Sequence, residues 1–80
     1  MIEVEVRLYA TLRRYRPGLG IGDPFVIALD DKAKLGNLLD ELKIPREEIK
    51  ATFVNGRWEE ESCFLQTGDR IGIFPPIGGG

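Results

Sequence analysis

The sequence predicts an α+β domain in which one helix packs across one face of a sheet of short strands. Three observations predict this class. Apolar and polar residues alternate over residues 2–9, as in a strand with one buried face. One segment carries leucines at helical spacing, and several short apolar runs follow it between turn signals. Because one helix covers only one sheet face, the other face is expected to be solvated or bound to another protein.

The first half of the chain contains two predicted strands and the helix. Residues 2–9 and 25–30 are the strands, joined by a short helical turn near 11–15 and a wide loop over 16–23. The helix is predicted over about 34–42, where four leucines fall at i, i+3, i+4 and i+7: Leu35, Leu38, Leu39 and Leu42.

Gly36 lies inside this predicted helix, where glycine costs about 1 kcal/mol relative to alanine. We therefore expect a closely packed neighbour at Gly36. Pro45 prevents the helix from continuing.

The second half predicts short strands separated by turns. Residues 51–54 form a strand, and Asn55-Gly56 predicts a tight turn because both residue types tolerate positive φ. Residues 57–58 are the predicted return strand, in which Trp58 is expected to be partly in the core. A short extended piece at 62–65 and a turn at Gly68-Asp69 lead to the last strand, 70–74.

Composition limits the classes of partner. The 80 residues are enough for one domain, and 11 basic against 13 acidic residues give a net charge of −2, which argues against general nucleic-acid binding. The arginines near Tyr15 are interpreted as a solvated loop or helical turn in preference to an RNA patch, with steering of an acidic protein partner as a third interpretation: Arg13, Arg14 and Arg16. No signal peptide or membrane span is visible. The single cysteine fits a reducing compartment, so a cytoplasmic location is predicted.

The residue types present argue against an enzyme acting alone. Histidine is absent, which excludes Ser-His-Asp and Cys-His nucleophilic sites and imidazole metal ligands. The one cysteine cannot form an internal disulfide, and Cys63 is interpreted as a buried small hydrophobe whose thiol pKa is raised by Glu59, Glu60 and Glu61. No metal site, phosphate loop or bound cofactor is expected.

The most unusual feature is the end of the sequence. Gly78, Gly79 and Gly80 follow Pro75-Pro76-Ile77, so side chains are missing where a narrow channel would exclude them. Prolines cannot continue a sheet ladder. We therefore divide the chain into a globular body, residues 1–74, and a mobile tail, residues 75–80, with the Gly80 α-carboxylate as the working group. A frayed terminus or an added glycine linker are the alternatives.

Two apolar residues next to the tail are candidates for a partner interface. Phe74 and Ile77 lie beside the predicted exit of the chain from the body, and Tyr9 is expected nearby. Phe74 could equally cap the core.

The order of elements and the end of the chain resemble the MoaD/ThiS sulfur-carrier family. The residues that carry this resemblance are Gly68-Asp69-Arg70, Phe74-Pro75-Pro76 and Gly79-Gly80, with support from Val54-Asn55-Gly56-Arg57. It covers essentially the whole chain, and Phe74-Pro75-Pro76 favours the MoaD branch. Gly78 departs from the family pattern, in which a small residue such as alanine is common. The resemblance implies a ubiquitin-like β-grasp fold with a mixed sheet of four to five strands.

The resemblance also implies a function. A ubiquitin-activating-type adenylating enzyme would consume ATP to activate the Gly80 carboxylate, and a sulfur donor protein would convert it to a thiocarboxylate. The tail would then enter a larger molybdopterin synthase subunit and deliver sulfur for the molybdenum or tungsten cofactor. Two alternatives stay open: a ubiquitin-like modifier joined to target lysines, and a sulfur carrier for thiamine or another pathway. A plain interaction domain with an inert tail is a further possibility.

Overall fold

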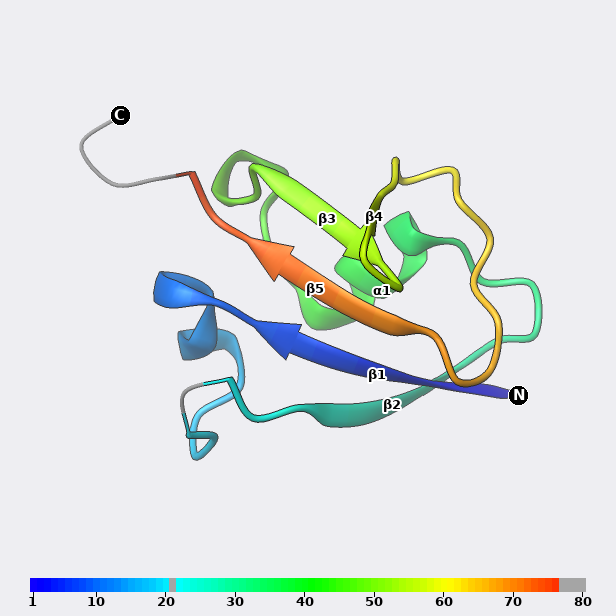
Figure 1. Ribbon diagram of the computed structural model, residues 1–80, viewed down its shortest axis with the longest axis horizontal. Helices are drawn as coiled ribbons and strands as arrows, with labels where there is room; N and C mark the ends of the chain where they lie inside the picture. The colour runs from blue at the N-terminus through cyan, green and yellow to red at the C-terminus, as the bar shows by residue number, and fades with distance from the viewer. Residues whose placement is uncertain (21, 77–80) are drawn as a thin grey trace.

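A computed structural model describes residues 1–20 and 22–76, and these form a single mixed sheet with a helix on one face (Figure 1). The sheet has five strands in the order β2-β1-β5-β3-β4. Their bounds are β1 Ile2–Leu8, β2 Phe25–Leu29, β3 Ala51–Val54, β4 Arg57–Trp58 and β5 Arg70–Phe74. The two central strands, β1 and β5, are parallel, and all other neighbouring pairs are antiparallel. This is the predicted ubiquitin-like β-grasp architecture.

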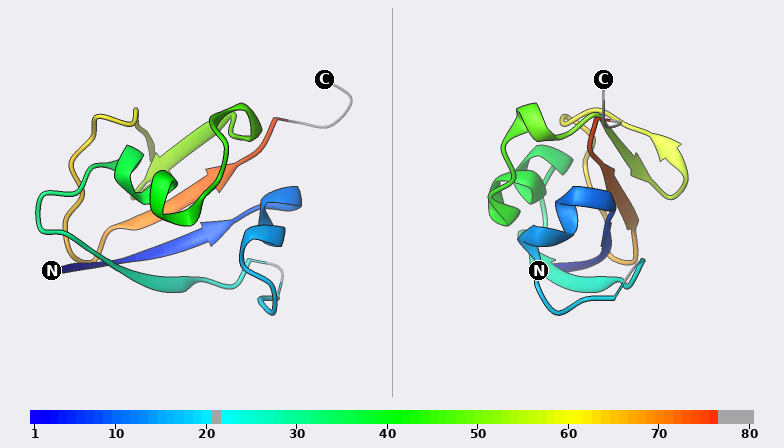
Figure 2. Two further views of the ribbon diagram at one scale, coloured as in Figure 1. Left: turned by 180° about the vertical axis from the view of Figure 1, so that it is seen from behind. Right: turned by 90° about the vertical axis from the view of Figure 1, so that its left-hand side faces the viewer.

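One α-helix, α1 (Leu35–Leu42), covers one sheet face, as predicted (Figure 2). Two 3₁₀ helices, η1 (Ala10–Tyr15) and η2 (Arg46–Glu48), lie in the connections. No helix in residues 1–20 and 22–76 is long and apolar enough to cross a bilayer.

The core lies between α1 and the inward side chains of the two central strands. Alternation along β1 and β5 sends every second side chain inward, and the leucine stripe of α1 meets them. These side chains are at most 2% exposed: Val4, Val6, Leu8, Leu35, Leu38, Leu39, Ile71 and Ile73. The predicted packing of one helix across one sheet face is therefore confirmed, and no α-helix of the described residues covers the opposite face.

Gly36 has the close neighbour that its place in α1 predicts. A Cβ added to Gly36 would lie 3.0 Å from the Glu61 Oε1 atom and 3.4 Å from the Glu61 backbone oxygen. The Gly36 N–H also donates a hydrogen bond of 3.0 Å to that same backbone oxygen. Glycine thus lets the start of α1 pack directly against the segment that follows β4.

The Asn55-Gly56 turn is confirmed, with φ values of 53° and 83°. It joins β3 to β4 in the predicted hairpin. The Asn55 side chain also accepts a hydrogen bond of 2.9 Å from the Arg70 N–H and donates one of 2.9 Å to Asp69. This turn is therefore fixed to the start of β5 by side-chain bonds that the local sequence does not reveal.

Two local predictions need correction. Trp58 was expected to be partly in the core, but it is 59% exposed, because β4 is a two-residue strand at the sheet edge with little beside it to cover a large ring. The segment 62–65 forms only a single bridge between Phe64 and Lys34 in place of an extended strand. Its backbone bonds go instead to the start of α1, where the Leu35 N–H donates to the Cys63 carbonyl at 2.8 Å.

The arginines near Tyr15 do not gather into one basic patch. Arg14 forms an ion pair with Glu48, and the Arg16 guanidinium carbon lies 4.4 Å from the centre of the Phe25 ring. The solvated-turn interpretation fits this arrangement better than an RNA site does.

Candidate functional site: the open sheet face and the end of β5

The last strand stops where the two prolines begin. The Phe74 carbonyl accepts a hydrogen bond of 2.8 Å from Lys50 N–H, and the Ile73 carbonyl accepts one of 3.2 Å from Tyr9 N–H. Pro75 and Pro76 have no N–H to extend this ladder. Pro75 is half-buried and Pro76 is exposed, so the chain leaves the sheet here. The remaining predicted site residues, Ile77, Gly78, Gly79 and Gly80, lie outside the described residues.

Three aromatic side chains gather beside this exit, and we call Tyr9, Phe53 and Phe74 the aromatic platform. The Tyr9 and Phe74 rings are stacked, with centroids 4.2 Å apart and planes 3° from parallel. Phe53 meets Phe74 edge to face at 5.5 Å and 83°. A Cβ on Gly72 would lie 3.4 Å from both the Tyr9 and Phe74 rings, so the stacked pair leans over a position without a side chain.

Phe74 lies on the sheet face opposite α1 and does not cap the core. Its neighbour Ile73 points into the core and is 0% exposed, so alternation sends Phe74 to the open face. Phe74 and Tyr9 therefore lie together beside the tail, as expected for two residues of a partner surface. The interface role itself stays a prediction.

Sequence reasoning missed one member of the aromatic platform, Phe53. Phe53 lies between Thr52 and Val54, whose side chains face the core. Because side chains alternate along a strand, the Phe53 side chain faces the open side of the sheet. What the sequence did not show is that β3 lies next to β5, with Phe53 opposite Gly72. Only this strand order brings Phe53 to Phe74.

A hollow of about 180 Å³ lies on the open face, lined by the aromatic platform together with Arg7, Gly56, Arg70, Ile71 and Gly72. The Arg7 guanidinium donates to Glu5 at 2.6 Å and to the Gly22 carbonyl at 3.2 Å. Arg70 forms no ion pair within residues 1–20 and 22–76. The face therefore combines apolar rings with Arg70, a cation that has no ion pair in the part of the chain that the structure describes, and this combination suits an acidic and apolar protein surface.

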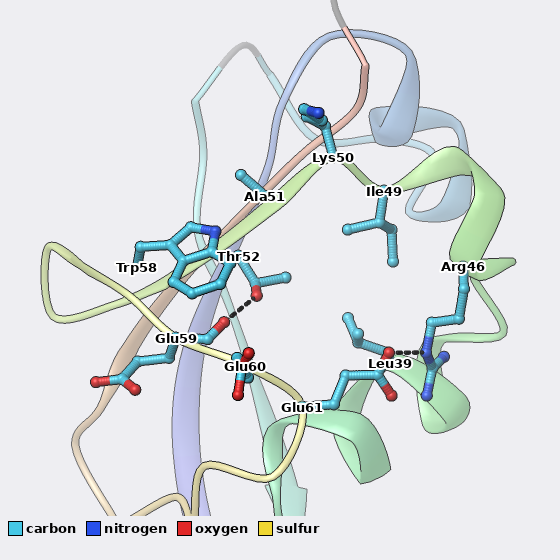
Figure 3. A pocket seen from close by; sticks show the side chains of 10 residues that line it. All are labelled: Leu39, Arg46, Ile49, Lys50, Ala51, Thr52, Trp58, Glu59, Glu60 and Glu61. Atoms are coloured by element: carbon cyan, nitrogen blue, oxygen red, sulfur yellow. Dashed lines mark hydrogen bonds and ion pairs between the residues drawn. The ribbon is translucent and has the colours of Figure 1, made fainter.

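A second hollow, of about 260 Å³, lies on the helix side between η2 and the β3–β4 hairpin (Figure 3). Its polar groups bond to one another: Arg46 donates to Glu61 at 2.8 Å, and the Thr52 hydroxyl donates to the Glu59 carbonyl at 2.8 Å. The hydrogen bond that Arg46 donates to the Glu61 carboxylate raises the pKa of Arg46 above its ordinary value. These contacts hold residues 59–61, which follow β4, against η2 and β3. Their role is therefore structural.

Cys63 does not have the properties of a nucleophile. Burial raises the pKa of its thiol, and the nearby carboxylates of Glu59 and Asp69 raise it further. Of the carboxylates predicted to raise this pKa, Glu59 does so, whereas Glu60 and Glu61 are not among its causes and Asp69, which folding brings near, is. Cys63 is half-buried, not fully buried as predicted. Reactive cysteines need a lowered pKa. Within the described ranges, no three His, Cys, Asp or Glu side chains are grouped so that they could hold a metal ion.

Comparison with known proteins identifies the family of this β-grasp domain. The family model of Mut7-C ubiquitin matches residues 1–78. The chain belongs to the Mut7-C ubiquitin family. A comparison with curated proteins found no match.

Several solved structures of small proteins share the fold of this Mut7-C ubiquitin domain. A Pyrococcus furiosus protein assigned as molybdopterin converting factor subunit 1 is 26% identical, with a TM-score of 0.75 over 96% of this chain and 100% of that one. The Haloferax volcanii HVO 2177 protein is 28% identical, with a TM-score of 0.75 over 99% and 87%. Small archaeal modifier protein 1 of H. volcanii, 21% identical with a TM-score of 0.76 over 96% and 100%, shows the shared fold alone. The predicted MoaD/ThiS-like resemblance is confirmed.

Proposed function

We propose that this protein is a sulfur carrier for molybdopterin biosynthesis, with the Gly80 α-carboxylate as the group that is activated and sulfurated. One observation carries the proposal: the ladder of a central strand ends at Pro75-Pro76 beside an open aromatic face. The Pyrococcus structure supports the molybdopterin route, since it covers 96% of this chain at 26% identity.

The chemistry needs little from the carrier itself. A free carboxylate is a poor electrophile, so its oxygen attacks the α-phosphorus of ATP and pyrophosphate leaves. The terminal sulfur of a donor-protein persulfide then attacks the acyl carbon, and AMP leaves with the electron pair of the broken C–O bond. A second thiolate would attack the donor cysteine sulfur of the resulting acyl disulfide, so that a new disulfide forms on the donor and the thiocarboxylate leaves with the electron pair of the broken S–S bond. An adenylating enzyme of the ubiquitin-activating type would supply the catalytic groups. This agrees with a chain that has no histidine.

The aromatic platform has the composition expected of a docking surface for the two enzymes that must receive the tail. Stacked rings offer large contact area with little side-chain entropy to lose, and such residues dominate interface energies. Arg70 adds a cation that can meet a carboxylate on the partner. The platform lies directly before the prolines, so docking there would bring the tail to the partner's active site.

The intact mass of the full chain tests the function. After incubation with an adenylating enzyme of this type, ATP and a sulfur source, we expect one terminal oxygen to be replaced by sulfur. Transfer of that sulfur to a pyranopterin precursor by a larger synthase subunit would support the molybdopterin route. Transfer only to a thiamine precursor would instead indicate a sulfur carrier for thiamine biosynthesis. High-mass conjugates that resist reduction would indicate a protein modifier. An unchanged mass would reject the carrier chemistry.

Phe74→Ala tests the docking surface. Removing one ring of the stacked pair is expected to weaken binding to the adenylating enzyme by about 30-fold or more, because an interface hot spot is worth about 2 kcal/mol or more. Phe64→Ala is the matched control, since it makes the same chemical change at a ring that is 63% exposed elsewhere on the surface. Titration calorimetry below the melting temperature measures both. Equal affinities for the two variants would remove the platform from the interface.

A further inference from the structure

The outer edge of β2 presents backbone groups that the fold leaves unpaired. In β1, the N–H groups of Glu5 and Tyr9 donate to the β5 side, at 2.9 Å to Asp69 and 3.2 Å to Ile73. Backbone groups alternate in direction along a strand, so the even-numbered residues of β1 face β2. They pair there with Phe25, Ile27 and Leu29. The N–H and C=O groups of Val26 and Ala28 therefore point away from the sheet, and no backbone bond to them occurs in the described residues.

This edge lacks the usual protection against pairing. The five residues of β2, Phe25–Leu29, contain no charge and no proline. Val26 is 61% exposed on the open face, and Ala28 is exposed beside it. Natural edge strands usually carry lysine, proline or a bulge to prevent edge-to-edge pairing. An apolar, uncharged strand at the rim of the sheet is instead suited to accept another strand (Figure 1).

Space for an added strand exists on the helix side as well. Two hollows, about 490 and 310 Å³, lie between β2 and α1, and Glu41 lines both. They are bordered by Leu29 and Ile27 respectively. Helix α1 thus leaves room beside the inward face of β2, where alternate side chains of a new strand would lie.

We propose that β2 pairs antiparallel with β2 of a second copy of this chain, about a two-fold axis through Ile27. In this register Val26 of each copy lies opposite Ala28 of the other copy. All four unpaired groups of each copy are then satisfied, which makes four hydrogen bonds across the axis. Ile27 meets its own symmetry mate as a non-hydrogen-bonded pair on the helix side.

Self-complementarity favours a second copy over a foreign strand. The same register places Asp30 of the second copy opposite Pro24, at the end of the strand where Arg16 lies 4.4 Å from the Phe25 ring. Arg16 of one copy and Asp30 of the other therefore approach at both ends, where the register also sets Asp23 opposite Asp31, while the paired strands themselves carry no charge. Two five-residue strands bury less surface than a stable interface needs, so the dimer is expected to be weak and dependent on concentration. It is independent of the proposed sulfur chemistry, and it leaves the end of β5 free because β1 lies between β2 and β5.

Sedimentation velocity on the full chain tests the dimer. We expect the dimer fraction to rise with concentration toward the order of 1 mM, the range of weak complexes. Val26→Lys places a positive charge on each of the two paired strands, which then repel each other. Ala28→Pro removes an N–H that points away from β1, so it removes hydrogen bonds of the dimer but keeps the β1–β2 ladder. Both variants are expected to be monomeric over this range. Trp58→Lys, at the opposite edge of the sheet, should dimerise like the parent chain.

Cross-linking tests the register. In a Cys63→Ser background, Ile27→Cys should form an intermolecular disulfide readily, because a non-hydrogen-bonded pair holds its Cα atoms about 4.5 Å apart, within disulfide range. Trp58→Cys in the same background is the control and should cross-link at least 10-fold more slowly. The proposal is overturned if the parent chain stays monomeric over this concentration range. That outcome includes the case in which β2 pairs with a strand of another protein but not with a second copy. Dimers that survive both β2 variants, or equal cross-linking rates, also overturn it.

Discussion

A chain that lacks Gly80 is expected to lose adenylation by about 100-fold or more while its unfolding midpoint stays nearly unchanged. The deletion moves the terminal carboxylate back by one residue, and misplacement of a reacting group by about 1 Å can already cost about 100-fold. The core residues all lie in the body, so the midpoint should not move. Pyrophosphate release with the adenylating enzyme measures the first effect, and thermal denaturation followed by circular dichroism measures the second.

Gly78→Ala is the matched control for this deletion. It adds one methyl group to the tail but keeps both the carboxylate position and the last two glycines, so adenylation should stay within about 10-fold of the parent chain. A large drop in the unfolding midpoint on loss of Gly80 would mean that the tail is part of the packed structure. Undiminished adenylation would mean that the enzyme does not require the terminal carboxylate at the position of Gly80.

Leu38→Ala is expected to lower the free energy of unfolding by about 3 kcal/mol. Leu38 is 0% exposed in the middle of α1, and truncating a fully buried leucine costs about 2–5 kcal/mol, from lost transfer free energy and the cavity left behind. Small domains have only about 5–15 kcal/mol in total. The unfolding midpoint should therefore fall by roughly 15 °C. Urea denaturation and calorimetry measure the two quantities.

Leu42→Ala is the control for Leu38→Ala, since it makes the same change one turn later on the same helix. Leu42 is only partly buried at the end of α1, so its truncation should cost about 1 kcal/mol. Equal losses at the two positions would mean that α1 packs on the sheet through its end as firmly as through its centre, contrary to the burial pattern.

The sequence was sufficient for most of the fold because each main element carries its own periodicity. Alternation at Val4, Val6 and Leu8 predicts β1, and the leucine spacing predicts α1 within one residue. Asn55-Gly56 predicts its hairpin from conformational preference alone. These signals are local, so they can be read without knowing what packs against what.

The predicted burial of Trp58 was wrong because burial is not a local property. The burial habits of tryptophan favour the core, but the outcome depends on whether another element covers the ring. β4 has two residues and lies at the sheet edge, so Trp58 stays 59% exposed. The same argument applies to segment 62–65, whose backbone groups found partners at the start of α1 and not in the sheet.

The sequence by itself determined the residue types at the candidate site: a narrow glycine end, two prolines and no histidine for catalysis. It also determined that Phe74 and Ile73 must face opposite ways, because side chains alternate along any strand. Only the tertiary structure decided that β1, β5 and β3 are neighbours, which brings Tyr9, Phe74 and Phe53 into one platform over Gly72. Strand order depends on which strands pair across long stretches of chain, and no local spacing records that choice.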